Sequence, residues 1–249
     1  MLQAQPSYKG IDVKNGGVIR GTARLKGDIP KIERYEITKN SEACGTVRTS
    51  QRLQVAPNRG VKNAIVYLES ITCGKKFSTD VKIELRQENC EYIPHVTIVP
   101  LGEGIEIVNN DPILHNIHAY GVQPGTPSFF NIAQPIKGQR TMISHKQLKE
   151  PGLITVTCDA GHPWMSGYIM IAGNPYYALT DDNGKFELAE VPPGSYKITM
   201  WHEGFQVTKK EIENGKVKRY CYEDPYETSS SVTVSENQES IVDFEFTKR

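Results

Sequence analysis

The chain has 249 residues and carries 29 Lys plus Arg against 29 Asp plus Glu, so its formal net charge at pH 7 is zero. This length suffices for one large β domain or two ordinary domains that each bury a core, and we expect two. The balanced charge gives a phosphate backbone no excess of cations to bind, which argues against a nucleic-acid partner. No apolar run approaches the roughly 20 residues needed to cross a bilayer, so we expect no membrane span.

The N-terminus bears on where the protein works. Its first six residues, Met-Leu-Gln-Ala-Gln-Pro, lack the charged and apolar regions of a signal peptide. Polar residues that lead directly to Gly16 and Gly17 are typical of a secreted protein whose signal peptide was removed and whose Met was restored for expression. We therefore expect a periplasmic or extracellular protein, with a cytoplasmic one as the alternative.

The five cysteines are an odd number, so at least one has no intramolecular disulfide partner. Cys158 belongs to the motif described below. The other four, Cys44, Cys73, Cys90 and Cys221, allow up to two bridges in three connectivities, which the sequence does not rank securely. We favour a pair between Cys44 and Cys90.

Strand and turn patterns dominate the chain and predict an all-β protein. Residues 18–26 alternate apolar and polar side chains with the period of a half-buried strand. Other β-branched or aromatic runs between Gly, Pro and Asn predict strands at 63–69, 81–86, 104–109, 153–158 and 168–172. No segment shows a convincing 3.6-residue apolar period.

Gly-Asn-Pro at 173–175 marks the expected boundary between a domain of residues 1–172 and a smaller one of residues 173–249. The second part reads as a regular meander with tight turns at 182–184 and 192–194. Its predicted strands are 176–180, 185–188, 196–201, 231–235 and 241–247. About 75 residues suffice for a small seven-stranded β-sandwich.

The stretch 158–165, Cys-Asp-Ala-Gly-His-Pro-Trp-Met, carries the most informative chemistry. It brings a thiol, an imidazole and a thioether together immediately after a predicted strand. Two His and one Cys in a trigonal set, with a distant Met, hold copper in both oxidation states with little movement. Although a single buried Cys or Met is usually structural, the combination Cys158, His162 and Met165 favours a copper site. Zinc is the alternative metal, yet a thioether contributes little to zinc.

A second histidine from another strand is needed, and His115 and His118 are the candidates. On a strand that starts at Leu114, His115 shares its face with Ile117 and Ala119, whereas His118 points to the other side. We therefore choose His115. We expect His118 at the surface or rim of the molecule. The alternative is that His118 lines the mouth of the copper site or replaces His115 as a ligand.

Residues 109–116, Asn-Asn-Asp-Pro-Ile-Leu-His-Asn, followed about forty residues later by Cys158, His162 and Met165, resemble the cupredoxins, which include plastocyanin, pseudoazurin and amicyanin. The His-Pro-Trp-Met ending is most similar to amicyanin, and the resemblance covers roughly residues 80 to 172. It implies a Greek-key β-sandwich with one type 1 copper ion bound by His115, Cys158, His162 and Met165.

The same resemblance implies that Asn116 braces the strand of the first ligand against the Cys loop. One departure is the spacing, because three residues separate Cys158 from His162 where amicyanin-like loops have two. The extra residue is Gly161, so the loop can absorb it, but the axial distance and the colour of the site are then open.

From 176 onward the phrases Tyr-Tyr-Ala-Leu-Thr-Asp-Asp-Asn-Gly-Lys-Phe and Val-Pro-Pro-Gly-Ser-Tyr resemble the carboxypeptidase regulatory-like, or transthyretin-like, β-sandwich. This motif marks a fold and no chemistry. The start of the chain, at 17–21 and 61–67, has a fainter version of the same pattern. A third small module is therefore an alternative, although we favour a single elaborated cupredoxin domain.

Two other histidines carry weaker expectations. His95 follows Pro94, where it is expected to hydrogen-bond to backbone at a bend rather than act as an alternative ligand. His202 lies between Trp201 and Glu203, and this group is expected to be packed, with contact to the partner domain or a role in electron exit as the alternative.

A site with four protein ligands leaves substrate no coordination position, so we expect single-electron transfer with a redox protein partner such as a cytochrome or an oxidoreductase. A copper-dependent redox enzyme or subunit with an open site is the alternative, but the sequence has no dense His cluster to build one. Copper storage or delivery is a third hypothesis, against which the total of five Met speaks. A cell-surface scaffold module without metal is a fourth. The second domain is expected to serve docking or oligomerisation.

Overall fold

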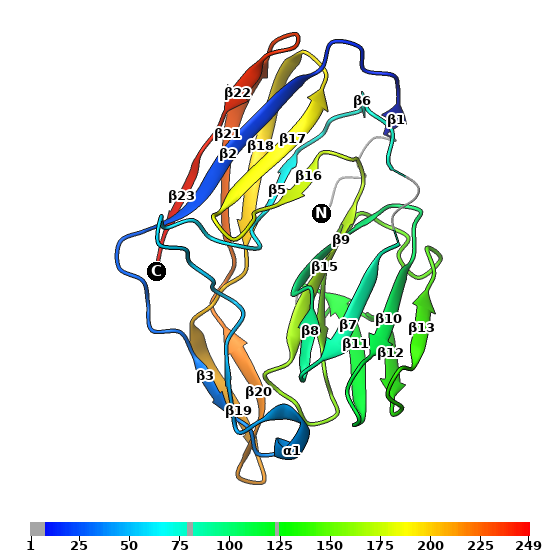
Figure 1. The fold of residues 1–249 in the computed structure, drawn as a ribbon, viewed down its shortest axis with the longest axis vertical. Coiled ribbons are helices and arrows are strands. Elements are labelled where there is room, and N and C mark those ends of the chain that lie inside the picture. The colour runs from blue at the N-terminus through cyan, green and yellow to red at the C-terminus, as the bar shows by residue number, and fades with distance from the viewer. Residues whose placement is uncertain (1–7, 79–81, 123–124) are drawn as a thin grey trace.

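The computed structural model describes residues 8–78, 82–122 and 125–249, and it consists almost entirely of β-strands (Figure 1). One short helix, α1 (Ser41–Cys44), interrupts them in the described part of the chain. The prediction of an all-β protein is therefore confirmed. The N-terminal residues 1–7 and residue 81, which begins one predicted strand, lie outside the described residues.

Two sheets form the first β-sandwich, at the lower right of Figure 1. The four-stranded sheet has the order β13 (Arg140–Ile143), β10 (Ile105–Asn109), β7 (Glu84–Glu88) and β8 (Glu91–Ile93). The five-stranded sheet has the order β12 (Ser128–Gln134), β11 (His115–Gly121), β14 (Gly152–Thr157), β15 (Ser166–Ala172) and β9 (Val96–Pro100). Side chains that alternate inward along these strands, such as Ile117, Ile154 and Val156, fill the core between the sheets.

The second β-sandwich, at the upper left of Figure 1, draws strands from both ends of the chain. One sheet has the order β16 (Tyr177–Leu179), β5 (Ile65–Leu68), β18 (Gly194–His202) and β21 (Tyr226–Val234). The other has β17 (Lys185–Val191), β2 (Gly17–Lys26) and β22 (Glu239–Ile241), with β23 (Phe244–Thr247) also pairing with β2.

The N-terminal strands thus do not lie where we expected them, because β2 and β5 were assigned to a first domain of residues 1–172 and lie in the second sandwich. Strand β2 pairs antiparallel with β17 and parallel with β22 and β23, and β5 lies between β16 and β18. Ile19, Leu25 and Val66 lie in one core cluster with Phe186 and Phe244. The alternating pattern of residues 18–26 identifies a half-buried strand, but it carries no information about which distant strand is its neighbour. Strands β2 and β5 therefore belong to the second sandwich and form no third module.

Three small sheets and α1 lie outside the sandwiches. The pairs are β1 (Lys9–Gly10) with β6 (Cys73–Gly74), β3 (Arg34–Glu36) with β4 (Val47–Thr49), and β19 (Val207–Glu213) with β20 (Lys216–Tyr222). The β19–β20 hairpin, which the sequence analysis did not predict, leaves the second sandwich and runs beside β3 towards α1 (Figure 1). Among the described residues, no helix has the length and apolar character needed to cross a bilayer.

A buried ionic cluster joins the two sandwiches. Arg52 Nη1 lies 2.6 Å from Glu203 Oε2, and His95 Nε2 is hydrogen-bonded to Glu203 Oε1. Arg52 also donates to Tyr168 and to the carbonyl of Gly204. Burial alone would raise the pKa of Glu203, but the charges of Arg52 and His95 outweigh it and hold that pKa below its ordinary value.

Trp201, His202 and Glu203 are packed at this junction, as expected from the sequence. The Trp201 ring lies against Tyr168 of the first sandwich, with ring centroids 5.1 Å apart. His202 is 1% exposed, its Nδ1 lies 2.8 Å from the Glu203 carbonyl oxygen, and burial lowers its pKa. Contact with the neighbouring domain, the alternative expectation for this group, is therefore also observed.

Candidate metal centre

The candidate site lies at one end of the five-stranded sheet, where neighbouring strands bring distant residues together. His115 is the first residue of β11, and Cys158 directly follows β14. These strands are antiparallel neighbours, with His118 opposite Thr157, so the start of one meets the end of the other. His162 and Met165 lie in the turn between β14 and β15, which closes over the same end.

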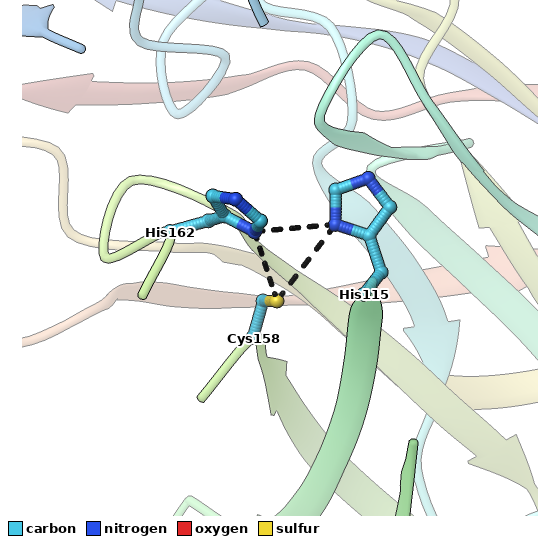
Figure 2. A group of neighbouring side chains, drawn as sticks. All are labelled: His115, Cys158 and His162. Carbon is cyan, nitrogen blue, oxygen red and sulfur yellow. Dashed lines mark hydrogen bonds between the residues drawn. The ribbon is translucent and has the colours of Figure 1, made fainter. Parts of the chain in front are cut away.

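Three donor atoms face one another at this end (Figure 2). His115 Nδ1 lies 3.2 Å from His162 Nδ1 and 3.9 Å from Cys158 Sγ, and His162 Nδ1 lies 3.4 Å from the same sulfur. Both imidazoles are fully buried, and Cys158 is 5% exposed. The structure therefore brings together three of the four residues predicted to bind copper, with their donor atoms directed at one another.

The spacing of these atoms fits a single metal ion. Metal–nitrogen bonds of about 2.0 Å and a metal–sulfur bond of about 2.3 Å place donor atoms that share an ion roughly 3 to 4 Å apart. The three observed separations fall within this range. One thiol and two imidazoles are also a donor set that suits copper.

Hydrogen bonds at the outer nitrogens orient both rings. His115 Nε2 donates to Asp111 Oδ2 over 2.8 Å, and His162 Nε2 donates to Asn40 Oδ1 over 3.1 Å. Because both acceptors are oxygens, the proton of each ring is held at Nε2 and the lone pair at Nδ1 is left facing the site. Such outer partners fix ring orientation and tautomer in metal sites.

The electrostatics of the site favour the neutral forms of Cys158 and His162 and the ionised form of Asp111. Burial raises the pKa of the Cys158 thiol to about 11. Burial, together with the nearby His115 ring, lowers the pKa of His162 to about 4. Burial opposes ionisation of Asp111 as well, but hydrogen bonds from His115 and from the amides of Cys90 and Asn89 hold its pKa below the ordinary value.

Met165, the predicted fourth ligand, is 1% exposed and lines the same cleft as Cys158 and His162. Two backbone hydrogen bonds close the loop, from the Met165 amide to the His162 carbonyl and from the Cys158 amide to the Met165 carbonyl. The extra loop residue, Gly161, has φ +87°, a left-handed conformation that side chains rarely adopt. A glycine at this position therefore lets the loop make a turn that a residue with a side chain would rarely adopt.

Asn116 contacts the Cys158 loop directly. Its side-chain oxygen accepts a hydrogen bond of 2.6 Å from the Asp159 amide, and its backbone amide lies 3.5 Å from Cys158 Sγ. The side-chain nitrogen of Asn116 donates a hydrogen bond to Asn131 Oδ1 on β12. This is the position that the resemblance implied for a brace between the two ligand segments.

A cleft of about 1140 Å³ opens over Cys158 and His162, between the first sandwich and the β19–β20 hairpin. His118 lines it with a side chain that is 27% exposed, and its Nδ1 lies 2.7 Å from Asp159 Oδ2. Lys39, Lys216 and Lys218 also line this cleft. His118 is thus at the rim and is not one of the three converging donors.

His95 lies elsewhere, in the ionic cluster at the junction of the sandwiches. Its ring is engaged by Glu203, and it does not belong to either of the donor clusters found among the described residues. The second such cluster is Cys90, Asp111 and His115, but Cys90 forms a disulfide with Cys44 and is therefore no thiolate ligand. The favoured Cys44–Cys90 pairing is confirmed.

Two hydrogen-bond partners of the predicted ligands, Asp111 and Asn40, were not predicted from the sequence. Asp111 precedes His115 by four residues, so a carboxylate close to a predicted ligand was an available signal. Asn40 lies 122 residues before His162, in a segment without a motif. Only the folded chain brings it to the ligand.

Comparison with known proteins supports the assignment of the C-terminal part. Residues 154–247 match the model of the carboxypeptidase regulatory-like domain, which confirms the resemblance found in the sequence. The matched range begins inside β14, earlier than the expected boundary. No curated protein sequence matches the chain.

Solved structures similar to this chain include copper proteins. A novel purple cupredoxin from Nitrosopumilus maritimus is 21% identical, with 36% of this chain and 100% of that chain covered and a TM-score of 0.32. Amicyanin from Paracoccus versutus is 20% identical, with 39% of this chain and 86% of that chain covered and a TM-score of 0.30. The Cu-containing nitrite reductase from Thermus scotoductus SA-01 is 22% identical, with 41% of this chain and 25% of that chain covered and a TM-score of 0.30.

Proposed function

We propose that this chain binds one copper ion through His115, Cys158 and His162, with Met165 as a weak fourth ligand, and that it transfers single electrons outside the cytoplasm. The observation that carries this proposal is the convergence of three donor atoms within 3.9 Å of one another. A copper ion bound there would accept and return one electron.

The donor chemistry favours copper over zinc. Zinc sites prefer Cys and His and gain little from a thioether, whereas thiolate and thioether ligands suit copper. Met165 is buried at the same end of the sandwich as the other three residues, in the core cluster that also contains Cys158 and Trp164. An apolar wall of this kind limits water at the thiolate and supports a long-lived complex.

The surroundings hold the ligands in place, which is what electron transfer requires. Asp111 and Asn40 fix the two rings, and Asn116 holds the Cys158 loop. Side chains restrained in this way move little when the charge of a bound ion changes, so little reorganisation accompanies each transfer.

A location outside the cytoplasm is supported by the Cys44–Cys90 disulfide, because such bonds persist mainly in oxidising compartments. The electron partner we propose is a redox protein that docks near the cleft. The second sandwich would then serve to place the β19–β20 hairpin beside that cleft, or to bring copies of the chain together.

Visible absorption and electron paramagnetic resonance spectra after addition of one equivalent of copper(II) test the proposal. We expect an intense thiolate-to-copper band and a narrow copper hyperfine splitting. Cys158→Ser should abolish the band with the fold retained, whereas Cys221→Ser, which changes a cysteine on the hairpin, should leave it unchanged. A weak, ordinary copper spectrum from the unmodified chain would refute a type 1 site.

The cleft favours one second candidate, a redox enzyme with an open copper position. Its floor includes Cys158 and His162, and its volume of about 1140 Å³ exceeds that of a small anion. Titration of the copper-loaded chain with azide separates the two functions. An open site gives a new ligand-to-metal band and a changed resonance spectrum, whereas the closed site gives unchanged spectra.

A further inference from the structure

The outer hydrogen-bond partners of both histidines are attached to one disulfide. Cys90 donates its backbone amide to Asp111 Oδ2 over 2.7 Å, and the same oxygen accepts the proton of His115 Nε2. The carbonyl of Cys90 accepts a hydrogen bond from the Trp164 ring in the ligand loop. The sulfur of Cys90 is bonded to Cys44.

Cys44 anchors the segment that covers His162. Asn40, whose side-chain oxygen accepts the proton of His162 Nε2, also accepts the amide of Cys44 with its backbone carbonyl over 2.8 Å. The preceding residue, Lys39, donates its ammonium group to the carbonyl of Ala160 in the ligand loop over 2.6 Å. Residues 39–44, here called the cap, therefore lie on the ligand loop at two points.

The burial of these groups follows from this arrangement. Cys44, Cys90, His115 and His162 are each 0% exposed, although three of the six cap residues, Lys39, Ser41 and Glu42, are exposed and polar. A four-residue helix has no independent stability in water, so the cap depends on its attachments. The disulfide is its one covalent attachment to the first sandwich.

We propose that Asn40 and the Cys44–Cys90 disulfide are positioning residues for the metal centre: the disulfide holds the cap over the outer edge of His162 and, through the Cys90 amide, fixes the carboxylate that orients His115. This inference rests on the proposed metal-binding function. It predicts that loosening one cross-link disturbs both imidazoles, although neither cysteine is a ligand.

Asn40→Gly tests the cap with little change to the backbone. Asn40 has φ 55°, which Gly adopts without strain, so this variant removes the side-chain oxygen and keeps the turn. Asn237→Gly is the matched control, because Asn237 has φ 53° and lies exposed in the second sandwich. A second variant, Cys44→Ser with Cys90→Ser, removes the disulfide.

The first readout is the rate at which the copper-loaded chain releases its metal to a chelator. Loss of an outer partner of a metal-bound His commonly weakens binding by about 10- to 100-fold, so we expect release from Asn40→Gly to be at least tenfold faster. The disulfide-free variant should release faster still, since both rings lose support. Asn237→Gly should match the unmodified chain.

The second readout needs no metal. We expect a maleimide to modify Cys158 of the metal-free chain several times faster in Asn40→Gly and in the disulfide-free variant than in Asn237→Gly. Mass spectrometry of the peptide that contains Cys158 separates this signal from the free cysteines Cys73 and Cys221.

The outcomes separate the inference from the proposed function. If no chain forms a thiolate–copper band but Cys158 still becomes more reactive in both variants, the copper proposal fails, and the result supports only that the cap and the disulfide hold His115, Cys158 and His162 in place. If copper binds normally and Asn40→Gly matches Asn237→Gly in both readouts, the positioning role is overturned. Should the disulfide-free chain fail to fold, Asn40→Gly alone decides.

Discussion

Two buried polar clusters flank the start of β15, and their polar groups are paired in different ways. At the junction of the sandwiches, Arg52 and His95 pair directly with the carboxylate of Glu203. At the end of the first sandwich, the outer nitrogens of His115 and His162 are bonded, while their inner nitrogens and Cys158 Sγ face one another.

The difference indicates what each cluster is for. A buried charge is stable only when it is paired and hydrogen-bonded, and in the junction cluster the charges pair with each other while Arg52 also donates to Tyr168 and to the Gly204 carbonyl. Converging lone pairs repel one another unless a proton or a cation lies among them. The first kind of cluster fixes how segments pack, whereas the second kind is suited to bind a cation.

The largest effect is expected from Arg52→Met in the metal-free chain. This substitution keeps an apolar side chain of similar length but leaves Glu203 buried without its main cationic partner, so we expect the free energy of unfolding to fall by about 3 to 5 kcal/mol. Urea unfolding measures the change. Arg24→Met is the control, since its pair with Asp243 is exposed and worth about 1 kcal/mol or less. Equal losses in the two variants would show that the junction cluster does not hold the sandwiches together.

A cation should stabilise only the second kind of cluster. Zinc is the suitable probe for unfolding experiments because it has no redox chemistry with the free thiols. At a free concentration about 100 times its dissociation constant, an ion that binds only the folded chain adds about 2.7 kcal/mol to the free energy of unfolding. We expect this gain in the unmodified chain and in Arg52→Met.

The matched variants are Cys158→Ser and Cys73→Ser. The first should lose the gain from zinc, and the second, which changes an exposed cysteine on β6, should keep it. A gain that survives in Cys158→Ser would place the zinc elsewhere and remove the contrast between the two clusters.

The residues of the candidate metal centre and several strands could be predicted from the sequence, because their signals are local. Cys158, His162 and Met165 lie within eight residues, and the alternation of β11 distinguishes His115 from His118. The same period-2 pattern locates β2, β14 and β23 to within a few residues.

What the sequence did not provide is pairing between distant segments. Arg52, His95 and Glu203 come from three separate parts of the chain, and nothing in their neighbours connects them. The partner of β2 is undetermined for the same reason, because alternation defines a face and not a neighbour. The β19–β20 hairpin was missed because β19 is rich in Lys and Glu and is mostly exposed. It therefore has no apolar face that would predict a strand.

The smallest effect concerns pH and tests whether Glu203 is charged in the folded chain. Its folded pKa lies below that of an unfolded Glu, about 4.3, so its ionised form adds stability at higher pH that is lost as the pH falls through the folded pKa. Glu203→Gln removes this contribution. The groups that face Glu203 are Arg52, His95 and His202.

We therefore expect the difference in free energy of unfolding between the unmodified chain and Glu203→Gln to be largest above about pH 5 and to shrink on acidification. The loss should be smaller than for Arg52→Met, because Gln keeps a neutral oxygen that can accept from Arg52 and His95, whereas Met removes every hydrogen bond of the guanidinium. Urea unfolding from pH 7 downward, in the absence of metal, gives this difference directly. If it stayed constant across the range, Glu203 would not be the titrating group, and the junction cluster would not be the charge-paired counterpart of the candidate metal centre.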